Sequence, residues 1–331
     1  MRKGHSRDSS QPIASGELIL KARTGTNWRR SALALSLSAT LFAFGVITGR
    51  RLHPSKPATA ADGMQFASRL DNLDATVKQL SLVLQQPSSV IEKTRDSVCF
   101  IVSTYTLTNP RSEGLQRDPY RLLGSGFLIA GNHVVSNRHV LEPWFGEPNS
   151  EEAIRSGSTP RRERITAYFP GYSQGVELTD IVVSDNADVA VASIKLPVGM
   201  NVQPLRFASR ASAPGDPVVV IGYPLGVTTM LAKSSAFPFR QPSLRQSQKD
   251  VDHLAKFKLI RPSATQGHLV DANDQMLMYD ASTAHGSSGG PVFNLQGEVI
   301  AVNAAYIDGF NGSSLGVSTA ELSSLLTPKS R

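Results

Sequence analysis

The sequence of 331 residues contains one cysteine, Cys99, so no disulfide can form within the chain. Aromatic residues are also few, at 7% of the chain, and charged residues make up only 18%. The 40% of hydrophobic residues can nevertheless supply the core of one or two domains. The fold must therefore be stabilised by its core alone, even in an oxidising compartment. We expect Cys99 to be a small buried hydrophobe in the first strand.

Excess positive charge is absent from most of the chain, although the formal net charge is +7. Nine of the 34 basic and two of the 27 acidic residues lie in residues 1–51, which leaves 25 of each sign beyond Arg51. A neutral bulk argues against nucleic-acid binding. A short basic tail beside an apolar segment is instead typical of membrane topology.

The only long uncharged apolar run is Ser31–Gly49, which is 19 residues long and lies between two pairs of arginines. As a helix it would span the hydrocarbon core, at ~1.5 Å per residue against ~30 Å. More positive charge precedes than follows it, which predicts a cytoplasmic N-terminal tail (1–30) and an exported C-terminal part. The alternative is a signal peptide cleaved after Ala60, but that position lies far beyond the apolar run, so we favour an uncleaved anchor.

An amphipathic helix is predicted at residues 64–86, after a Pro/Ala-rich linker at 50–63. Its apolar residues are spaced alternately by four and three positions, the a/d pattern of a coiled coil. They are Phe66, Leu70, Leu73, Val77, Leu80 and Leu84. We expect Pro87 to end this helix. The segment either joins copies of the chain into a homo-oligomer or packs on the rest of the protein.

From Val98 onward, short apolar runs alternate with turn residues, which predicts an all-β domain. Gly131-Asn132 and Asn294–Gly297 are expected turns between strands. The polar stretches Ser150–Arg164 and Ala232–Arg261 are expected to be surface insertions. Only the C-terminal end has a helical pattern, where Ser318 and Glu321 have the spacing of a capping box.

Ser288 is the candidate nucleophile, because it lies in the glycine-rich run HGSSGGP at residues 285–291. Neighbouring glycines allow a tight backbone whose N–H groups face a developing oxyanion. The same residues match the nucleophile elbow of α/β-hydrolases. In that class the catalytic histidine follows the serine, whereas all seven histidines of this chain precede Ser288, so the elbow is rejected.

His139 and Asp188 complete a candidate His–Asp–Ser triad. His139 follows a predicted strand, and Asp188 stands at the start of the apolar run Val189–Ile194. Asp180 and Asp185 are nearby rivals, but only Asp188 directly abuts a buried run, where a shielded carboxylate can orient an imidazole.

Four blocks in this order resemble the trypsin-like serine peptidases, most closely the bacterial HtrA-type branch. They are GSGF (124–127), NRHV (137–140), DVAV (188–191) and GSSGGP (286–291), and GDPVVVIGYPLG (215–226) adds to the resemblance. It implies a peptidase domain at 90–331 with two antiparallel Greek-key β-barrels of chymotrypsin-like type, at about 95–200 and 205–327, and a C-terminal helix. Arg138 and Ser287 depart from the usual residues, and no PDZ domain is expected.

The resemblance implies a serine endopeptidase that acts on exported or misfolded proteins. Gly286 and Ser288 would form the oxyanion hole, and uncharged residues would bind the substrate side chain. The expected substrate-binding residues are Ser282, Thr283, Asn303, Ala304 and Ala305. An inactive scaffold that binds peptides or a membrane partner is the alternative. No metal or cofactor is expected, and the expected location is the bacterial inner membrane, with the peptidase domain in the periplasm or outside.

Overall fold

The computed structural model describes residues 60–109, 119–234, 247–306 and 313–326. The predicted tail and anchor (1–49) and most of the linker lie outside these ranges. None of the helices within them is both long and apolar enough to cross a bilayer.

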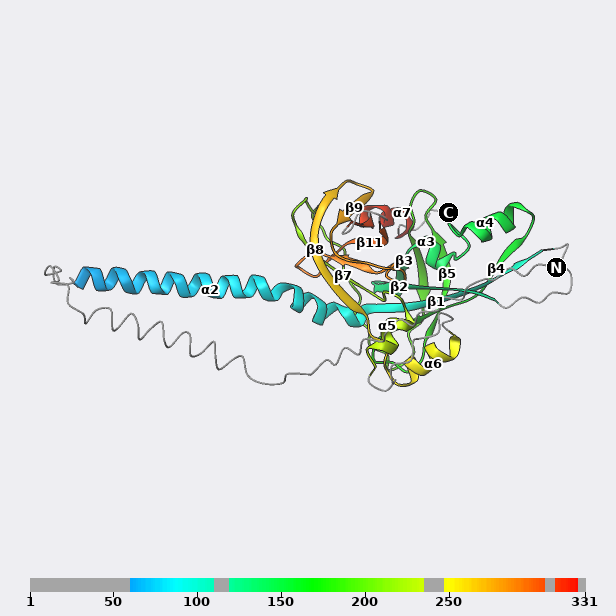
Figure 1. Ribbon diagram of the computed structural model, residues 1–331, viewed down its shortest axis with the longest axis horizontal. Helices are drawn as coiled ribbons and strands as arrows, with labels where there is room; N and C mark the ends of the chain where they lie inside the picture. The colour runs from blue at the N-terminus through cyan, green and yellow to red at the C-terminus, as the bar shows by residue number, and fades with distance from the viewer. Residues whose placement is uncertain (1–59, 110–118, 235–246, 307–312, 327–331) are drawn as a thin grey trace, which may run out of the picture. The chain divides into compact units, whose positions relative to one another are not determined.

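Helix α2 (Ala60–Thr94) is the longest element and contains the predicted amphipathic segment (Figure 1). Its expected end at Pro87 is wrong, because the helix continues for seven residues to Thr94. Packing near its end explains the difference: Val90 is 4% exposed and Ile91 packs against the core, while the hydroxyl of Thr94 donates to the carbonyl of Val90. Tertiary contacts here outweigh the loss of one backbone hydrogen bond at proline.

Six antiparallel strands form a first closed barrel, in the order β1-β2-β3-β6-β5-β4. They are β1 (Val98–Thr108), β2 (Tyr120–Ile129), β3 (His133–Ser136), β4 (Thr159–Tyr168), β5 (Val176–Val183) and β6 (Ala190–Ile194). The β2–β3 turn lies between the paired residues Ile129 and His133 and has positive φ at both Gly131 and Asn132, which turn residues of these types tolerate. That expected turn is confirmed.

A second closed barrel has the same strand order, β7-β8-β9-β12-β11-β10. Its strands are β7 (Pro217–Gly222), β8 (Ser263–Ala272), β9 (Met276–Tyr279), β10 (Pro291–Phe293), β11 (Val299–Tyr306) and β12 (Ser314–Ser318). The turn at Asn294–Gly297 lies between β10 and β11 and is closed by a hydrogen bond from the Gly297 amide to the Asn294 carbonyl. The all-β prediction is confirmed, and two six-stranded barrels are consistent with a chymotrypsin-like fold.

One hydrophobic core joins the two barrels. It includes Phe100 and Val135 from the first barrel and Val219 and Phe293 from the second. Tyr223 links them further, since its ring lies 5.3 Å from that of Phe100 and its hydroxyl donates to the carbonyl of Val98 at 3.0 Å. The interface between the barrels is therefore part of the hydrophobic core, beside one smaller buried cluster in each barrel.

Both stretches expected to be surface insertions contain structural elements, so that expectation is wrong. Residues 150–164 include the end of α4 (Pro148–Arg155) and half of β4, and Ser150 is buried with its Oγ 2.8 Å from the hydroxyl of Tyr105. Residues 232–261 include α6 (Gln248–Lys256), which buries Val251 and Leu254 in the shared core.

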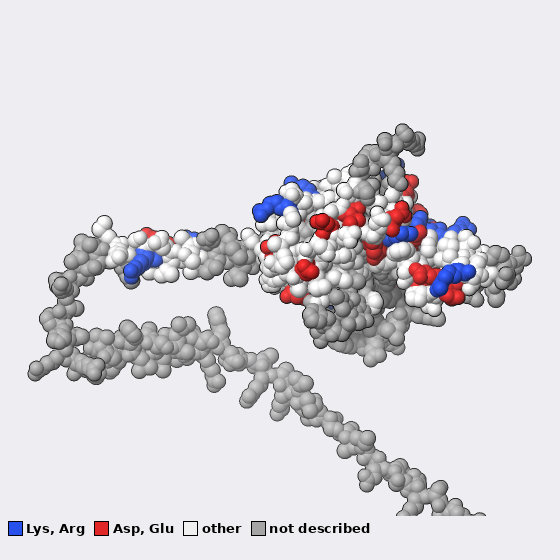
Figure 2. Space-filling view, turned by 90° about the horizontal axis from the view of Figure 1, so that it is seen from above, with Lys and Arg blue, Asp and Glu red and all other residues white. Residues whose placement is uncertain are grey.

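Five short helices make up the remaining regular structure of the described residues. They are η1 (Arg95–Ser97), α3 (Arg138–Leu141), α5 (Val227–Ala232), η2 (Thr319–Leu322) and α7 (Ser323–Leu326). The expected capping box near the C-terminus is not formed, because the Ser318 hydroxyl accepts from Ala320 N rather than from Glu321 N. Figure 2 shows acidic and basic side chains interspersed on one face, in keeping with the neutral bulk of the sequence.

Candidate active site

Strand pairing brings His139 and Asp188 together across 49 positions of sequence. His139 lies on α3, directly after β3, and Asp188 lies just before β6. Because β3 pairs with β6, with Ser136 opposite Ala190, the end of one strand meets the start of the other.

Both carboxylate oxygens of Asp188 bind His139. Oδ2 lies 2.7 Å from the ring Nδ1, and Oδ1 accepts from the backbone N–H at 3.0 Å. A carboxylate can only accept, so Nδ1 carries the proton and a neutral ring leaves Nε2 as an acceptor. The side-chain Nδ2 of Asn137 donates a 2.7 Å hydrogen bond to the backbone carbonyl of Asp188 and so holds this segment in place. The imidazole is thereby fixed in position and tautomer.

Ser288 lies in a tight turn that β2 and β11 hold from two sides. Its carbonyl accepts from the Ser125 amide at 2.8 Å, and its Oγ donates to the carbonyl of Ala304 at 3.1 Å. No hydrogen bond joins Ser288 to His139 within the described ranges.

Glycine is required at two positions of this turn. Gly286 has φ +90°, and a Cβ there would lie 2.5 Å from the carbonyl oxygen of Tyr223. Gly289 has φ +87°, and its Cβ would collide with the carbonyl of Ser125 and the hydroxyl of Ser136. A side chain at either position would displace the turn that contains Ser288.

The N–H groups of Gly286 and Ser288 face away from the carbonyls that precede them, as in any trans peptide. Those carbonyls are occupied: His285 O accepts from Leu225 N at 2.6 Å, and Ser287 O accepts from Gly290 N at 3.0 Å. Within the described residues, no acceptor is bonded to either N–H. Both N–H groups are thus without an acceptor in the described part of the chain, as the donors of an oxyanion hole must be before substrate binds.

Ser125 supports this turn, a role that the sequence did not indicate. It is fully buried, donates to the carbonyl of Gly286 at 2.7 Å and accepts from Tyr223 N at 3.0 Å. Ser136 in turn donates to the carbonyl of Ser125 at 2.7 Å. The available signal was their position, since Ser125 lies in the GSGF block and Ser136 directly precedes the NRHV block.

The expected substrate-binding residues occupy two neighbouring segments. Ser282 and Thr283 precede the Ser288 turn, and Thr283 Oγ1 lies 2.9 Å from Ser314 Oγ on β12, a residue that the sequence analysis did not single out. Asn303, Ala304 and Ala305 lie on β11, where Ala305 pairs with Leu315. Asn303 is 2% exposed and its Oδ1 accepts from the Tyr279 hydroxyl, so its side chain has a structural partner.

Arg138 adds a charge beside His139. Its Nε lies 2.6 Å from Glu142 Oε2 in an ion pair whose side chains are 20% and 19% exposed. Its Nη1 donates to the carbonyl of Ser184 at 3.0 Å, and its guanidinium lies over the Phe145 ring at 4.1 Å. Arg138 therefore connects the helix of His139 with the loop that leads to Asp188.

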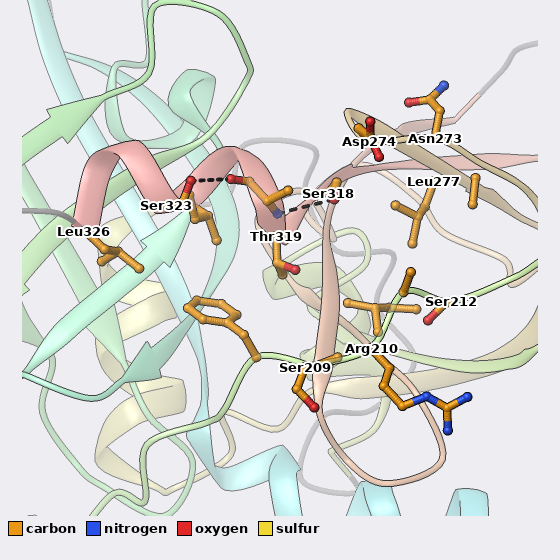
Figure 3. Close-up of a pocket in the computed structure, with 17 residues that line it drawn as sticks. Ser209, Arg210, Ser212, Asn273, Asp274, Leu277, Ser318, Thr319, Ser323 and Leu326 are labelled. Carbon is orange, nitrogen blue, oxygen red and sulfur yellow. Dashed lines mark hydrogen bonds between the residues drawn. The ribbon is translucent and has the colours of Figure 1, made fainter.

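A separate cavity of about 480 Å³ lies between the segment 207–212, the β8–β9 turn and the C-terminal helices (Figure 3). Ser209, Arg210, Asp274 and Thr319 are among its lining residues. It contains none of the predicted site residues, and we give it no catalytic role. In the described part of the chain, no three His, Cys, Asp or Glu side chains cluster as a metal site would need.

The sequence matches the family described as "Trypsin-like peptidase domain" over residues 124–302. HhoA of Synechocystis sp. is 27% identical over 184 residues, which cover 55% of this chain and 36% of that protein. The periplasmic serine endoprotease DegP of Salmonella typhimurium is 23% identical over 216 residues, with coverages of 62% and 34%. A crystal structure of the Rv3671c protease from Mycobacterium tuberculosis in its active form matches at 20% identity and a TM-score of 0.46, covering 71% of this chain and 81% of the other. The chain thus spans 36% and 34% of the length of the two sequence relatives.

Proposed function

The chain belongs to the family of trypsin-like peptidase domains, and on this premise we propose that it is a serine endopeptidase of the HtrA type that acts through His139, Asp188 and Ser288. The observation that carries the proposal is the two-point attachment of His139 to Asp188, at 2.7 and 3.0 Å. A histidine that is held this way, with Nε2 left as an acceptor, is suited to general-base chemistry.

In the proposed reaction, Ser288 attacks the peptide carbonyl while His139 removes the proton from Oγ. His139 then gives that proton to the leaving amine, and water hydrolyses the acyl-enzyme by the same route. Asp188 stabilises the imidazolium through the Nδ1 hydrogen bond. Before attack, the Ser288 hydroxyl must give up its hydrogen bond to the Ala304 carbonyl and donate to Nε2 of His139 instead.

The N–H groups of Gly286 and Ser288 are proposed to bind the oxyanion. Each such donor is typically worth about 3 kcal/mol in the transition state. The bond from Ser125 to the Gly286 carbonyl and the bond from Leu225 to the His285 carbonyl support this orientation before substrate arrives. Donors that are fixed in advance need no reorganisation during the reaction.

The proposed substrates are exported or misfolded proteins, by analogy with the periplasmic relative. Ser282, Thr283, Ala304 and Ala305 carry no charge, so we expect a small or medium apolar side chain before the scissile bond rather than Lys or Arg. The hydroxyls of Thr283 and Ser314 bond to each other at 2.9 Å, which adds no charge to this segment and is compatible with that preference.

For its location, we propose a single-pass anchor at residues 31–49 in the bacterial inner membrane, with the peptidase domain in the periplasm or outside. The charge distribution around the run supports this topology. We further propose that copies self-associate through residues 66–84. Leu70, Leu73 and Val77 support this, because they are 50%, 60% and 57% exposed on α2 at coiled-coil spacing.

The proposal is tested by casein hydrolysis with the full chain in detergent. Ser288→Ala should lose turnover by about a millionfold, and Asp188→Asn by about ten-thousandfold. Asp185→Asn, in the same loop but outside the triad, is the matched control and should keep turnover. Wild-type turnover in Ser288→Ala would refute the mechanism, and a folded but inactive wild type would favour the scaffold alternative.

A further inference from the structure

A cavity of about 640 Å³ lies apart from the proposed triad, where η1, the loop after β4, the end of α5 and the segment after α6 meet. Its volume lies in the range of sites for small molecules, about 300–1,000 Å³. It contains none of the predicted catalytic or substrate-binding residues. It therefore needs an explanation of its own.

Cationic side chains dominate the lining of this cavity. Four converge on it, Arg95, Lys233, Lys258 and Arg261, while the one carboxylate among its described lining residues is Asp96. Asp96 lies 3.7 Å from Arg95 Nε, at an exposed site. The other three cations have no carboxylate within ion-pair distance in the described ranges. The described lining of the cavity thus has an excess of three positive charges.

Lys233 shows the same lack of a counter-ion. Its Nζ donates to Ser263 Oγ at 2.5 Å, a neutral acceptor. Desolvation by the surrounding atoms lowers the pKa of Lys233 below that of a free lysine, and no nearby carboxylate offsets this. An anion in the cavity would stabilise the charged form.

Lys258 is held in a strained conformation at the edge of the cavity. Its φ is +55°, and it follows α6 in a turn closed by bonds from Leu259 N to Leu254 O and from Lys258 N to Ala255 O. Glycine is the usual residue at such a position, because a side chain is disfavoured at positive φ. Lys258 is also one of the residues that line the cavity, and backbone strain at such a position is a reason to look for a function there.

From this arrangement we propose that the cavity binds a compact polyanion with phosphate groups, of the size of tripolyphosphate. Two guanidinium groups can bind phosphate oxygens bidentately, and two ammonium groups add point charges. The net charge of +3 of the described lining offsets most of the roughly four negative charges that tripolyphosphate carries at neutral pH. A bounded cavity with cations on several sides suits a small free anion better than a flat membrane surface.

Isothermal titration of the full chain in detergent with sodium tripolyphosphate tests the proposal. We expect one site per chain. Lys258→Gly should weaken binding about tenfold or more, while its unfolding midpoint stays the same or rises because the strain at positive φ is removed. Arg261→Gln should weaken binding similarly. The matched control is Lys195→Gln, which removes one charge from an exposed position outside the cavity and should leave the affinity unchanged.

Three results would overturn the proposal. The first is no binding heat at millimolar tripolyphosphate with a folded wild type. The second is equal weakening by Lys195→Gln and Lys258→Gly, which would reflect net charge alone. The third is displacement of tripolyphosphate by phosphatidylglycerol added to the micelles, which would assign the cavity to a lipid headgroup instead of a free anion.

Discussion

The side chain of Arg138 connects the helix that contains His139 with the loop that leads to Asp188. Its guanidinium binds Glu142 on one side and the Ser184 carbonyl on the other. Ser184 Oγ in turn accepts from the amides of Asn186 and Ala187, in the loop that leads to Asp188. Arg138 is therefore a positioning residue, which the sequence marked only as a departure from the usual small residue.

Arg138→Ala should destabilise the protein by about 2 kcal/mol, because Glu142 would remain half-buried without its charged partner. Urea unfolding measures this change. The matched control is Arg155→Ala, whose pair with Glu152 is 71% and 66% exposed, and which should change stability by less than about 0.5 kcal/mol. Equal effects of the two variants would contradict the role given to Arg138.

Cys99 should be unreactive in the native protein. The prediction that it is a buried hydrophobe is confirmed, since it is 0% exposed in β1. Burial raises the pKa of its thiol well above the usual value, so the reactive thiolate is suppressed throughout the neutral and mildly alkaline range. Iodoacetamide at pH 8 should label Cys99 only after denaturation, as read by intact mass. Rapid stoichiometric labelling of folded protein would be inconsistent with this environment.

Among the elements, the turn 285–290 depends most on its neighbours. The turn at Tyr223–Gly226 lies under it, and Ser125 on β2 bonds to both. Its geometry is therefore set by contacts from both barrels.

Gly286→Ala should lower turnover by about a hundredfold or more, because a Cβ 2.5 Å from the Tyr223 carbonyl forces the proposed oxyanion donors out of place. Gly157→Ala is the control. Gly157 has φ +96°, but open space surrounds its Cβ position, so that variant should cost about 1 kcal/mol of stability and keep turnover. Hydrolysis and unfolding of both variants separate steric displacement from backbone strain, and full activity of Gly286→Ala would contradict the assignment.

Strands with continuous buried runs could be predicted from the sequence, whereas β4, whose first half is exposed, could not. β4 was missed because the residues of its first half, TPRRER, are mostly exposed and show no apolar alternation. α6 had a usable signal: Ser247 and Asp250 form a capping box before the buried Val251 and Leu254. The many polar and basic residues between Ala232 and Arg261 had favoured the interpretation as a surface insertion instead of a helix.

The whole molecule repeats one six-strand topology twice, although no repeat is evident in the sequence. Main-chain hydrogen bonds between the strands close each barrel, and many different side-chain sequences are compatible with that pairing. For the candidate site, His139 and Asp188 could be predicted because His139 follows one apolar run and Asp188 directly precedes another. The supporting roles of Ser125 and Ser314 could not, because they depend on contacts between segments more than 30 positions apart.

At the scale of the whole molecule, the proposed self-association through α2 can be tested by mutation. Leu73→Gln combined with Val77→Gln should reduce the particle mass, because both side chains lie at a/d positions and are exposed on α2. Light scattering of the full chain in detergent measures it. Ser68→Gln combined with Ala75→Gln changes exposed positions on the opposite side of the heptad pattern and should leave the mass unchanged. A monomeric wild type would rule out the proposed oligomer.

Whether Ser288 is the nucleophile is tested by labelling the full chain with a fluorophosphonate, followed by peptide mass mapping. We expect one label per chain on Ser288, no label in Ser288→Ala, and strongly slowed labelling in His139→Ala. A folded wild-type chain that takes up no label, or takes it up at a serine other than Ser288, would contradict the proposed triad.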